Sequence, residues 1–262
     1  MSSIGRIKEL TSKLFLTNIS KGNISLHEYT EDKLLFLEVI LSKELECRRI
    51  NKIRYLKGKS GIKQEDYNKT LDLFNIAFTK NITKWHINRL KSVNFIKDKT
   101  NVIIMGQAGV GKTHLAIGTA LTAIEQEIKT FYVTADDLVK IINDKENVKQ
   151  NKKMEYIKSC DLVIIDEFGY IPLDTKDVIS LYNIINNINN YTSIIVITNR
   201  DFVNWKDIFY DEVLASTILD RLLEKSFLIK IDSESYRIKD KNKTPDIDDT
   251  NAGEEDECKQ SK

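Results

Sequence analysis

Residues 106–113 read Gly-Gln-Ala-Gly-Val-Gly-Lys-Thr and match the pattern G-x-x-x-x-G-K-[ST]. In loops of this pattern, glycines let backbone N–H groups approach the phosphates of a nucleoside triphosphate. The lysine reaches the β- and γ-phosphates, and the final hydroxyl binds Mg²⁺. We therefore expect ATP and Mg²⁺ as cofactors, with Lys112 also acting in catalysis and Thr113 as a Mg²⁺ ligand. The residues expected to contact ATP are Gly106, Gln107, Ala108, Gly109, Val110, Gly111, Lys112, Thr113 and His114.

Two adjacent carboxylates, Asp166 and Glu167, follow the apolar run at residues 162–165. A buried strand of this kind ends at the carboxyl edge of an open α/β sheet, which is where ligands bind. Phosphoryl transfer needs a bound metal and a group that orients the attacking nucleophile. We assign Asp166 to the Mg²⁺ site, and Glu167 to orienting and deprotonating the attacking water.

Three further residues are candidates for the same site. Asn199 follows another apolar run and would lie between the two acids and the γ-phosphate, although asparagine is also common in turns. Arg221 is of the type that a neighbouring subunit supplies to neutralise charge in the transition state. The alternative for Arg221 is an i,i+3 ion pair with Glu224 on a helix surface. Arg237 is a candidate for contacting phosphate within its own subunit, and a structural role for it is equally open.

The elements that must position these residues are visible as apolar runs. They lie at residues 102–105, 130–134, 162–165, 194–198 and 227–231. Runs without alternating polarity predict strands buried on both faces, hence a mostly parallel sheet with right-handed crossovers. A helix from about residue 112 to 126 would direct its positive N-terminal end at the phosphates. The sequence therefore predicts an α/β fold, with a five-stranded, mostly parallel sheet flanked by helices.

The region before the sheet has a different pattern. Thr30 is placed to cap a helix with an apolar stripe at Leu34, Leu37, Leu41 and Leu45, which breaks near Ser60. A linker at residues 64–70 and a helical stretch at residues 82–95 follow. We divide the chain into a helical basic N-terminal region (1–66), an ATPase domain (67–238) and an acidic tail (239–262). The tail has little to bury and should be disordered, and residues 1–25 are also expected to be poorly ordered.

Charge is distributed unevenly along the chain. Residues 1–100 carry a net charge of +9, residues 101–238 a net charge of −5, and the tail a net charge of −3. A basic front suits contact with a polyanion such as the backbone of double-stranded DNA; the alternative is a solvated helix face. A second basic group lies between the phosphate loop and the Asp166–Glu167 pair. It could likewise contact DNA or be a solvated surface, and it comprises Lys145, Lys149, Lys152, Lys153 and Lys158. The candidate DNA-binding residues of the front are Arg48, Arg49, Lys52, Arg54, Lys57, Lys59 and Lys63.

Cysteine usage and hydropathy narrow the protein class further. The three cysteines, Cys47, Cys160 and Cys258, show no C-x-x-C spacing, which fits a reducing compartment and argues against structural zinc. The chain contains no apolar stretch of the length that a membrane span needs. We therefore expect a soluble, cytoplasmic protein with no membrane partner.

Several of these motifs together resemble the IstB-like ATPases. The resemblance lies in residues 106–116, 165–174, 198–209, 215–223 and 234–237, and in the basic residues 45–63. The runs Asp-Glu-Phe-Gly-Tyr at 166–170 and Ile-Leu-Asp-Arg-Leu-Leu at 218–223 are far more specific than the phosphate loop. Gln107 and Ala108 depart from the family, which usually has Pro-Pro there, and the acidic tail has no counterpart in the family pattern.

The resemblance implies a specific kind of activity. IstB-like ATPases are similar to DnaC-type helicase loaders, and both belong to the AAA+ class. The chain would then be a Mg²⁺-dependent ATPase that forms a homo-oligomer through ATP-bridged interfaces on DNA, selects the target and stimulates a cognate transposase. The alternative is a loader for a replicative helicase. A metabolic P-loop kinase is disfavoured because no lid for a phosphate acceptor is evident and Arg221 would have no function.

Overall fold

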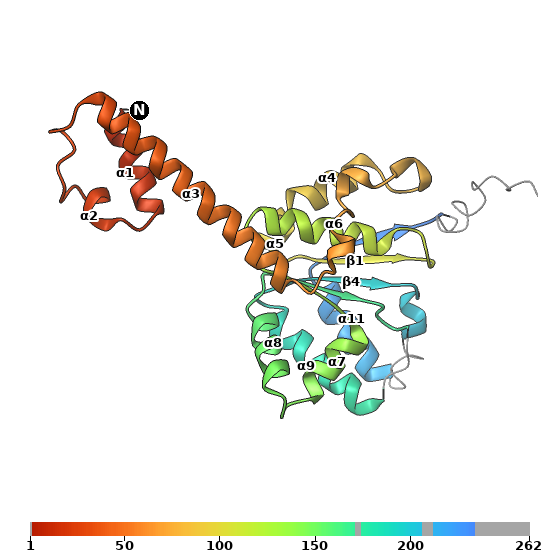
Figure 1. The fold of residues 1–262 in the computed structure, drawn as a ribbon. Helices are drawn as coiled ribbons and strands as arrows, with labels where there is room; N and C mark the ends of the chain where they lie inside the picture. The colour runs from red at the N-terminus through yellow and green to blue at the C-terminus, as the bar shows by residue number, and fades with distance from the viewer. Residues whose placement is uncertain (1, 171–173, 206–211, 234–262) are drawn as a thin grey trace, which may run out of the picture.

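The computed structural model describes residues 2–170, 174–205 and 212–233. Figure 1 shows an α/β body and, at a distance from it, a small group of helices at the N-terminus. The long helix α3 (Glu31–Lys59) connects the two parts. Arg237 and the acidic tail lie outside the described residues, so the predictions made for them stay predictions.

The described strands form one sheet in the order β2-β3-β4-β1-β5, and all neighbouring strands are parallel. Each strand begins and ends within one residue of the apolar run that predicted it, so the predicted sheet and the α/β class are confirmed. The strands are β1 (Asn101–Gly106), β2 (Thr130–Thr134), β3 (Leu162–Asp166), β4 (Ser193–Thr198) and β5 (Ser226–Ile231).

Alternate residues of strands β1 to β4 face two different helical layers, whereas one face of the edge strand β5 is exposed, as at Leu228. On β1, Ile103 and Met105 belong to one core, whereas Val102 and Ile104 belong to the other. Because both faces are covered, the strands are apolar at successive positions rather than at every second one. The first layer contains α7 (Ala135–Asn143), α8 (Val148–Lys158), α9 (Thr175–Ile188) and α11 (Glu212–Leu223), and the second contains α4 (Lys84–Ser92), α5 (Asn94–Lys97) and α6 (Lys112–Glu125) (Figure 1).

The prediction that residues 1–25 are poorly ordered is wrong. They form α1 (Ser3–Lys13) and α2 (Thr17–Ser20), and the Ser2 side chain caps α1 by accepting from the Gly5 N–H. Ile7 and Leu14 pack with Leu34 and Leu41 of α3 in a separate apolar core. The three- and four-residue spacing of Ile4, Ile7, Leu10 and Leu14 is the signal for this helix.

Helix α3 begins after Thr30 and ends at Ser60, as the sequence predicted. Its 29 residues extend over about 43 Å, so its first half packs on α1 while its second half reaches the body. There, Lys52 Nζ lies 2.6 Å from Glu127 Oε2, just beyond α6, and Leu56 enters the body's core. The body and the N-terminal helices are therefore joined by one continuous helix.

The segment between α3 and the sheet is more structured than a linker. It contains three 3₁₀ helices, η1 (Gln64–Asp66), η2 (Leu71–Leu73) and η3 (Ile76–Phe78). The helical stretch predicted at residues 82–95 is divided into α4 and α5 by Val93, which has a φ of 47°. No helix in the described part of the chain combines the length and the apolar character that a membrane span requires.

The buried Cys160 provides a test of this packing. Its thiol donates to the Tyr156 carbonyl oxygen, and burial raises the pKa of Cys160 to about 12. Only the thiolate reacts with alkylating reagents. We expect a variant that keeps only Cys160 to be alkylated at pH 8 at least about a hundredfold more slowly than one that keeps only the exposed Cys47. The rates should converge in urea, and similar rates in the folded protein would contradict the burial of Cys160.

Candidate nucleotide-binding site

The loop between β1 and α6 has a backbone that only glycine fits at two positions. Gly106 and Gly111 have φ angles of 153° and 98°. A Cβ atom on Gly106 would lie 2.6 Å from the Ile231 carbonyl oxygen, and one on Gly111 would lie 2.8 Å from the Phe74 ring. The loop is therefore held against β5 on one side and against Phe74 on the other.

Lys112 is the first residue of α6 and folds back over this loop. Its Nζ donates to the carbonyl oxygens of Gly106 and Gln107, at 2.8 and 2.7 Å. The ammonium group thus lies at the N-terminal end of a 14-residue helix, where the helix dipole also favours an anion. This arrangement fits the phosphates of a nucleotide.

The two ATP motifs meet at Asp166. Thr113 Oγ1 donates to Asp166 Oδ2 at 2.9 Å across 53 residues of sequence. The carboxylate is almost fully buried, with 5% of the residue exposed, and its Oδ1 accepts from the Glu167 N–H at 2.7 Å. A hydroxyl and a carboxylate are oxygen ligands of the kind that Mg²⁺ prefers, so Thr113 and Asp166 fit the ion.

Glu167 follows Asp166 in a strained backbone conformation. Its φ of 56° lies in the left-handed region, which is unfavourable for a residue with a Cβ atom. The next residue fixes the turn, because Phe168 is buried beside Trp205 and its N–H donates to the Ile197 carbonyl oxygen at 2.9 Å. The Glu167 side chain is exposed at the edge of the sheet that carries the loop.

Asn199 comes directly after β4, which lies between β3 and β1 in the sheet. Because all three strands are parallel, Asn199 emerges at the same edge as Asp166 and the phosphate loop, and between them. Thr198 is paired with Met105, one residue before the loop. The strand order thus places Asn199 between the two motifs, and its role at a γ-phosphate stays a prediction.

Arg221 lies at the opposite edge of the sheet. The Asn189 side chain donates to the Arg221 carbonyl oxygen, and Asn101, at the start of β1, donates to Asn189 and to Leu222. The phosphate loop follows the far end of β1, about 17 Å away along the strand. The Arg221 side chain also forms the ion pair with Glu224, at 3.4 Å, that the sequence left open. Arg221 and the loop of its own subunit are therefore not brought together.

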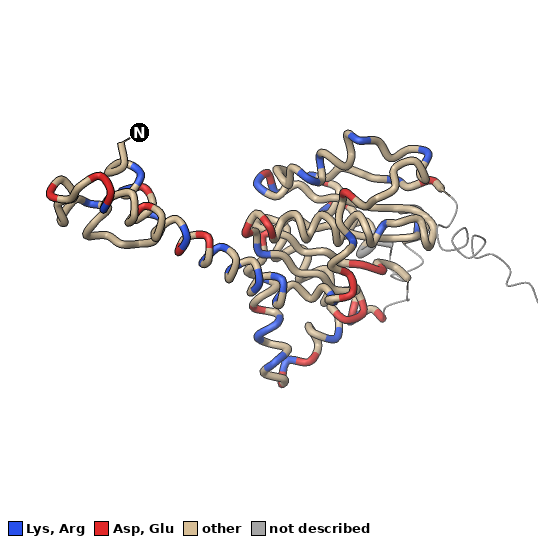
Figure 2. The backbone as a smooth tube through the Cα atoms, turned by 45° about the horizontal axis from the view of Figure 1, so that its top comes forward, with Lys and Arg blue, Asp and Glu red and all other residues tan. Residues whose placement is uncertain are grey.

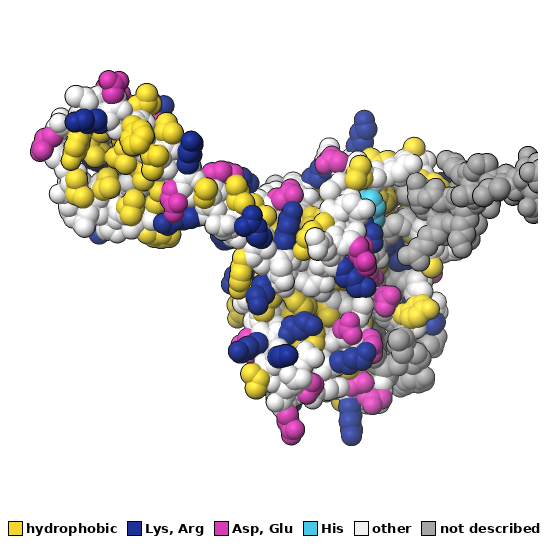
Figure 3. All heavy atoms as spheres, viewed as in Figure 1, with side chains coloured by type: hydrophobic (Ala, Val, Ile, Leu, Met, Phe, Trp, Pro, Cys, Tyr) yellow, Lys and Arg dark blue, Asp and Glu magenta, His cyan; other side chains and the backbone are white. Residues whose placement is uncertain are grey.

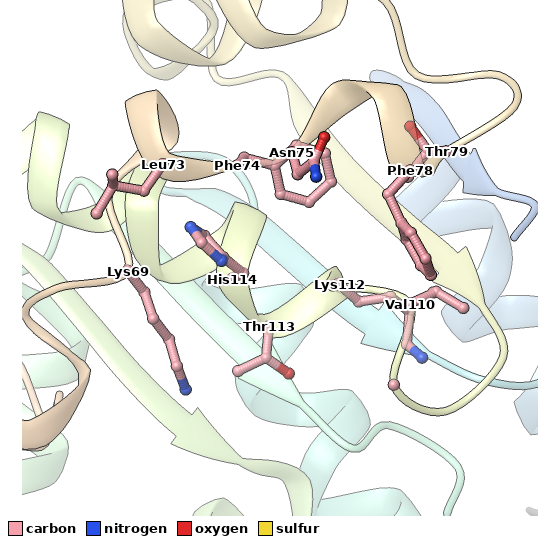
Figure 4. Close-up of a pocket in the computed structure, with 12 residues that line it drawn as sticks. Lys69, Leu73, Phe74, Asn75, Phe78, Thr79, Val110, Lys112, Thr113 and His114 are labelled. Carbon is pink, nitrogen blue, oxygen red and sulfur yellow. The ribbon is translucent and has the colours of Figure 1, made fainter. Parts of the chain in front are cut away.

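A cavity of about 340 Å³ opens beside the phosphate loop (Figure 4). Its volume is in the range of small-molecule sites. His114 lines it, with its ring edge-on to Phe74 at 5.6 Å and its Nε2 2.8 Å from the Thr70 carbonyl oxygen. Its wall opposite the loop comes from the segment predicted as a linker and from the residues after it, namely Lys69, Leu73, Phe74, Asn75, Phe78 and Thr79. This cavity is placed to hold the base of a nucleotide whose phosphates occupy the loop.

Tyr132 on β2 is a site residue that sequence reasoning missed. Its hydroxyl donates to Asp166 Oδ2 at 2.8 Å, the same oxygen that Thr113 contacts. Burial raises the pKa of Tyr132, and the nearby Asp166 charge raises it further. The phenol is therefore a hydrogen-bond donor throughout the physiological pH range. The strand was predicted, but its position beside β3 could not be read from the sequence.

Figure 2 marks the Lys and Arg positions along the backbone of α3, and their side chains have either acidic or neutral partners. Arg49 and Lys52 face Glu127, Lys57 faces Glu125, and Arg48 pairs with Glu44. Arg54 donates to Asn51, and the Lys59 ammonium lies over the Tyr55 ring at 6.0 Å. The ion pairs with Glu125 and Glu127 help to hold α3 on the body, whereas the Arg48–Glu44 pair lies within the helix. DNA contact remains a prediction for all seven basic residues, including Lys63, which pairs with Glu65.

Comparison with known proteins defines the family. A sequence model of the family described as IstB-like ATP binding protein matches residues 12–244. The chain belongs to this family. This IstB-like protein is 32% identical, over 239 residues, to the putative ATP-binding protein of insertion sequence IS5376 from Geobacillus stearothermophilus. The alignment covers 90% of this chain and 95% of the relative.

Two solved structures are similar in fold to this IstB-like protein. The crystal structure of the DnaC helicase loader matches with a TM-score of 0.53 and 20% identity, covering 65% of this chain and 100% of that one. AMPPCP-bound DnaA from Aquifex aeolicus matches with a TM-score of 0.51 and 22% identity, covering 66% of this chain and 54% of that one. The body of the IstB-like protein therefore has the fold of these two proteins, as the resemblance implied.

The Phe74→Leu variant tests the cavity as the base site. Leucine keeps apolar volume but removes the ring, so we expect ATP to bind about three- to tenfold more weakly. Binding of inorganic tripolyphosphate should be unchanged. Calorimetric titration of both ligands measures the two effects.

The matched control is Phe95→Leu, which alters a buried ring that packs edge-on to Phe227, outside the cavity. This control should leave both affinities unchanged. Equal losses for ATP and tripolyphosphate in Phe74→Leu would show that Phe74 supports the loop rather than the base.

Proposed function

We propose that this protein is an ATP-dependent, DNA-binding helper of an insertion-sequence transposase. It hydrolyses ATP in an oligomer assembled on DNA, and thereby selects the target and stimulates transposition. The observation that carries the proposal is the Thr113–Asp166 hydrogen bond. It joins the phosphate loop to the expected metal carboxylate in a chain whose relative is named as an insertion-sequence ATP-binding protein.

The proposed chemistry uses residues at the carboxyl edge of the sheet. Lys112 binds the β- and γ-phosphates, and Thr113 and Asp166 hold Mg²⁺, which neutralises phosphate charge when bound. Glu167 orients a water molecule and accepts its proton as the oxygen attacks the γ-phosphorus. The bond between the γ-phosphorus and the bridging oxygen breaks, and ADP and phosphate are released. Asn199 contacts the γ-phosphate from between the two motifs.

Arg221 is proposed to complete the site of a neighbouring subunit. Its distance from its own phosphate loop, along β1, favours action in trans over action in cis. An arginine supplied in trans neutralises the charge that develops on the transferred phosphoryl group. Hydrolysis would then depend on assembly, because a lone subunit lacks this charge.

DNA is proposed to contact α3 and the region around it. Figure 3 shows Lys and Arg side chains gathered where α3 meets the body. Arg54 and Lys59 contact neutral partners, which leaves their charge available for phosphate. Each neutralised phosphate releases counterions, so binding should weaken steeply with added salt.

A replicative-helicase loader is the second candidate, favoured by the likeness to the DnaC helicase loader over all of that chain. At 20% identity this likeness concerns the fold alone. A transposase gene beside this one would favour the transposition helper, and neighbouring replication genes would favour the loader. The direct test is a pull-down with the adjacent transposase. Absence of both ATP-dependent association and stimulated strand transfer would reject the transposition helper.

The Glu167→Gln variant tests the hydrolytic assignment. We expect it to bind ATP normally and to hydrolyse it at least about a hundredfold more slowly, because the amide cannot accept the proton. The assembled form should then persist on duplex DNA. Single-turnover hydrolysis and electron microscopy with ATP and DNA measure the two effects. Lys112→Ala is the contrasting variant, which should lose both ATP binding and ATP-dependent assembly, and normal hydrolysis by Glu167→Gln would contradict the assignment.

Mixed oligomers test the position of Arg221. The Arg221→Ala subunit keeps an intact phosphate loop, and the Lys112→Ala subunit keeps the arginine. We expect each variant alone to be inactive and an equal mixture to recover part of the wild-type ATPase rate. The upper limit is about a quarter, the fraction of randomly mixed interfaces that pair an intact loop with the arginine, because Lys112→Ala subunits join the assembly less readily.

The control for this experiment is Glu224→Ala, which removes the ion pair but keeps the arginine. It should remain active. If Glu224→Ala and Arg221→Ala lose ATPase activity equally, and mixing Arg221→Ala with Lys112→Ala restores none, the Arg221–Glu224 ion pair has a structural role.

A further inference from the structure

We propose that Tyr132 is a positioning residue that links the nucleotide site to the end of α3. Its side chain holds Asp166, and its main chain holds the C-terminus of the helix. The inference rests on the proposed binding of Mg²⁺ and ATP at Thr113 and Asp166. It goes beyond that function because it connects the site to α3, the helix proposed to contact DNA.

The side-chain half of the link is a hydrogen bond to a buried carboxylate. Asp166 Oδ2 accepts from both Tyr132 and Thr113, while Oδ1 accepts from the Glu167 N–H. Thr113 belongs to the nucleotide loop, and its hydroxyl is the group expected to turn toward Mg²⁺. Tyr132 comes from the neighbouring strand, in register with Ile164 two residues before Asp166. It therefore keeps the carboxylate oriented when Thr113 changes partner.

The main-chain half of the link lies on the outer edge of the sheet. β2 is an edge strand, and the Tyr132 N–H donates to the Ser60 carbonyl oxygen at 2.7 Å. Ser60 is the fully buried C-cap of α3. Gly61 follows with a φ of 74°, and a Cβ atom there would lie 2.4 Å from the Tyr132 carbonyl oxygen. The backbone of the turn after α3 is thus packed directly on the backbone of Tyr132.

The side-chain and main-chain contacts both belong to Tyr132, so a movement at one can reach the other. Ser60 Oγ also donates to the Lys57 carbonyl oxygen, and the Tyr67 hydroxyl donates to the same oxygen, so the last turn of α3 is tied to the turn that follows it. Because close-packed groups transmit displacement, a shift of this turn moves the Tyr132 backbone and hence the hydroxyl on Asp166. By reciprocity, Mg²⁺ and nucleotide at Asp166 stabilise one position of the end of α3.

The first experiment titrates Mg²⁺ into the full-length protein with a fluorescent, non-hydrolysable ATP analogue. Tyr132→Phe keeps the ring and removes the donor to Asp166. We expect the Mg²⁺ concentration for half-maximal binding to rise about tenfold, as for other residues that orient a metal ligand. Analogue binding in EDTA should be unchanged. An unaltered Mg²⁺ titration would overturn the side-chain half of the proposal.

Tyr156→Phe is the matched control. The Tyr156 hydroxyl is buried and has no hydrogen-bond partner among the described residues, and burial raises the pKa of Tyr156 to about 12. Its removal should leave the Mg²⁺ titration unchanged. An equal shift in both variants would show that any loss of a phenol from the body disturbs the site.

The second experiment measures hydrogen exchange in the wild-type protein and in Tyr132→Phe. Mg²⁺ with the analogue should slow exchange of the Tyr132 amide and of residues 57–62 severalfold in the wild type, and the analogue in EDTA should not. In Tyr132→Phe, saturated with Mg²⁺ and analogue, this protection should be lost. Protection that is absent from the wild type, or that persists in the variant, would overturn the link to α3.

These outcomes separate the proposal from the function on which it rests. If the wild type binds the analogue no better than Lys112→Ala does, the nucleotide site itself is wrong. If the wild type binds with Mg²⁺ and Tyr132→Phe behaves identically in both experiments, only the Tyr132 link is wrong.

Discussion

The arrangement of the site depends on one topological constraint, the insertion of β4 between β3 and β1. Parallel strands all end at one edge, so this order places the Asp166 carboxylate, Asn199 and the phosphate loop side by side. The hydrogen bond between Thr113 and Asp166 reaches across the single strand that separates β3 from β1. Because α11 leads into β5, which is parallel to β1, its C-terminal end lies at the other edge of the sheet, and this separates Arg221 from its own loop.

The edge strand β2 gives the body a place to attach α3. Edge strands present unpaired backbone groups that natural proteins cover, and here the Ser60 carbonyl oxygen covers the Tyr132 N–H. Ion pairs between α3 and the end of α6 add to this attachment at an exposed surface, where each contributes up to about 1 kcal/mol. Some basic side chains of α3 therefore attach the helix to the body, and DNA contact is proposed for the same set of residues.

The sequence predicted those parts of the fold that depend on local pattern. Apolar runs predicted the five strands of the described residues, and the phosphate loop and the Asp166–Glu167 pair could be read directly from residue type and spacing. Phe74 and Tyr132 were missed for a different reason. Phe74 lies between two short 3₁₀ helices, in a segment without a periodic signal. The contact of Tyr132 depends on strand order, which no local pattern specifies. The helix at residues 3–13 was missed although its apolar spacing is regular, because its core partner lies in α3.

The left-handed backbone at Glu167 has a consequence for evolution. A residue with a Cβ atom costs about 1 kcal/mol more there than glycine does. Glycine or asparagine at position 167 would relieve that strain and remove the carboxylate in the same step. Selection for a more stable fold and selection for turnover therefore act in opposite directions on this residue. A lineage in which the site only had to bind nucleotide would be free to drift toward the more stable choice.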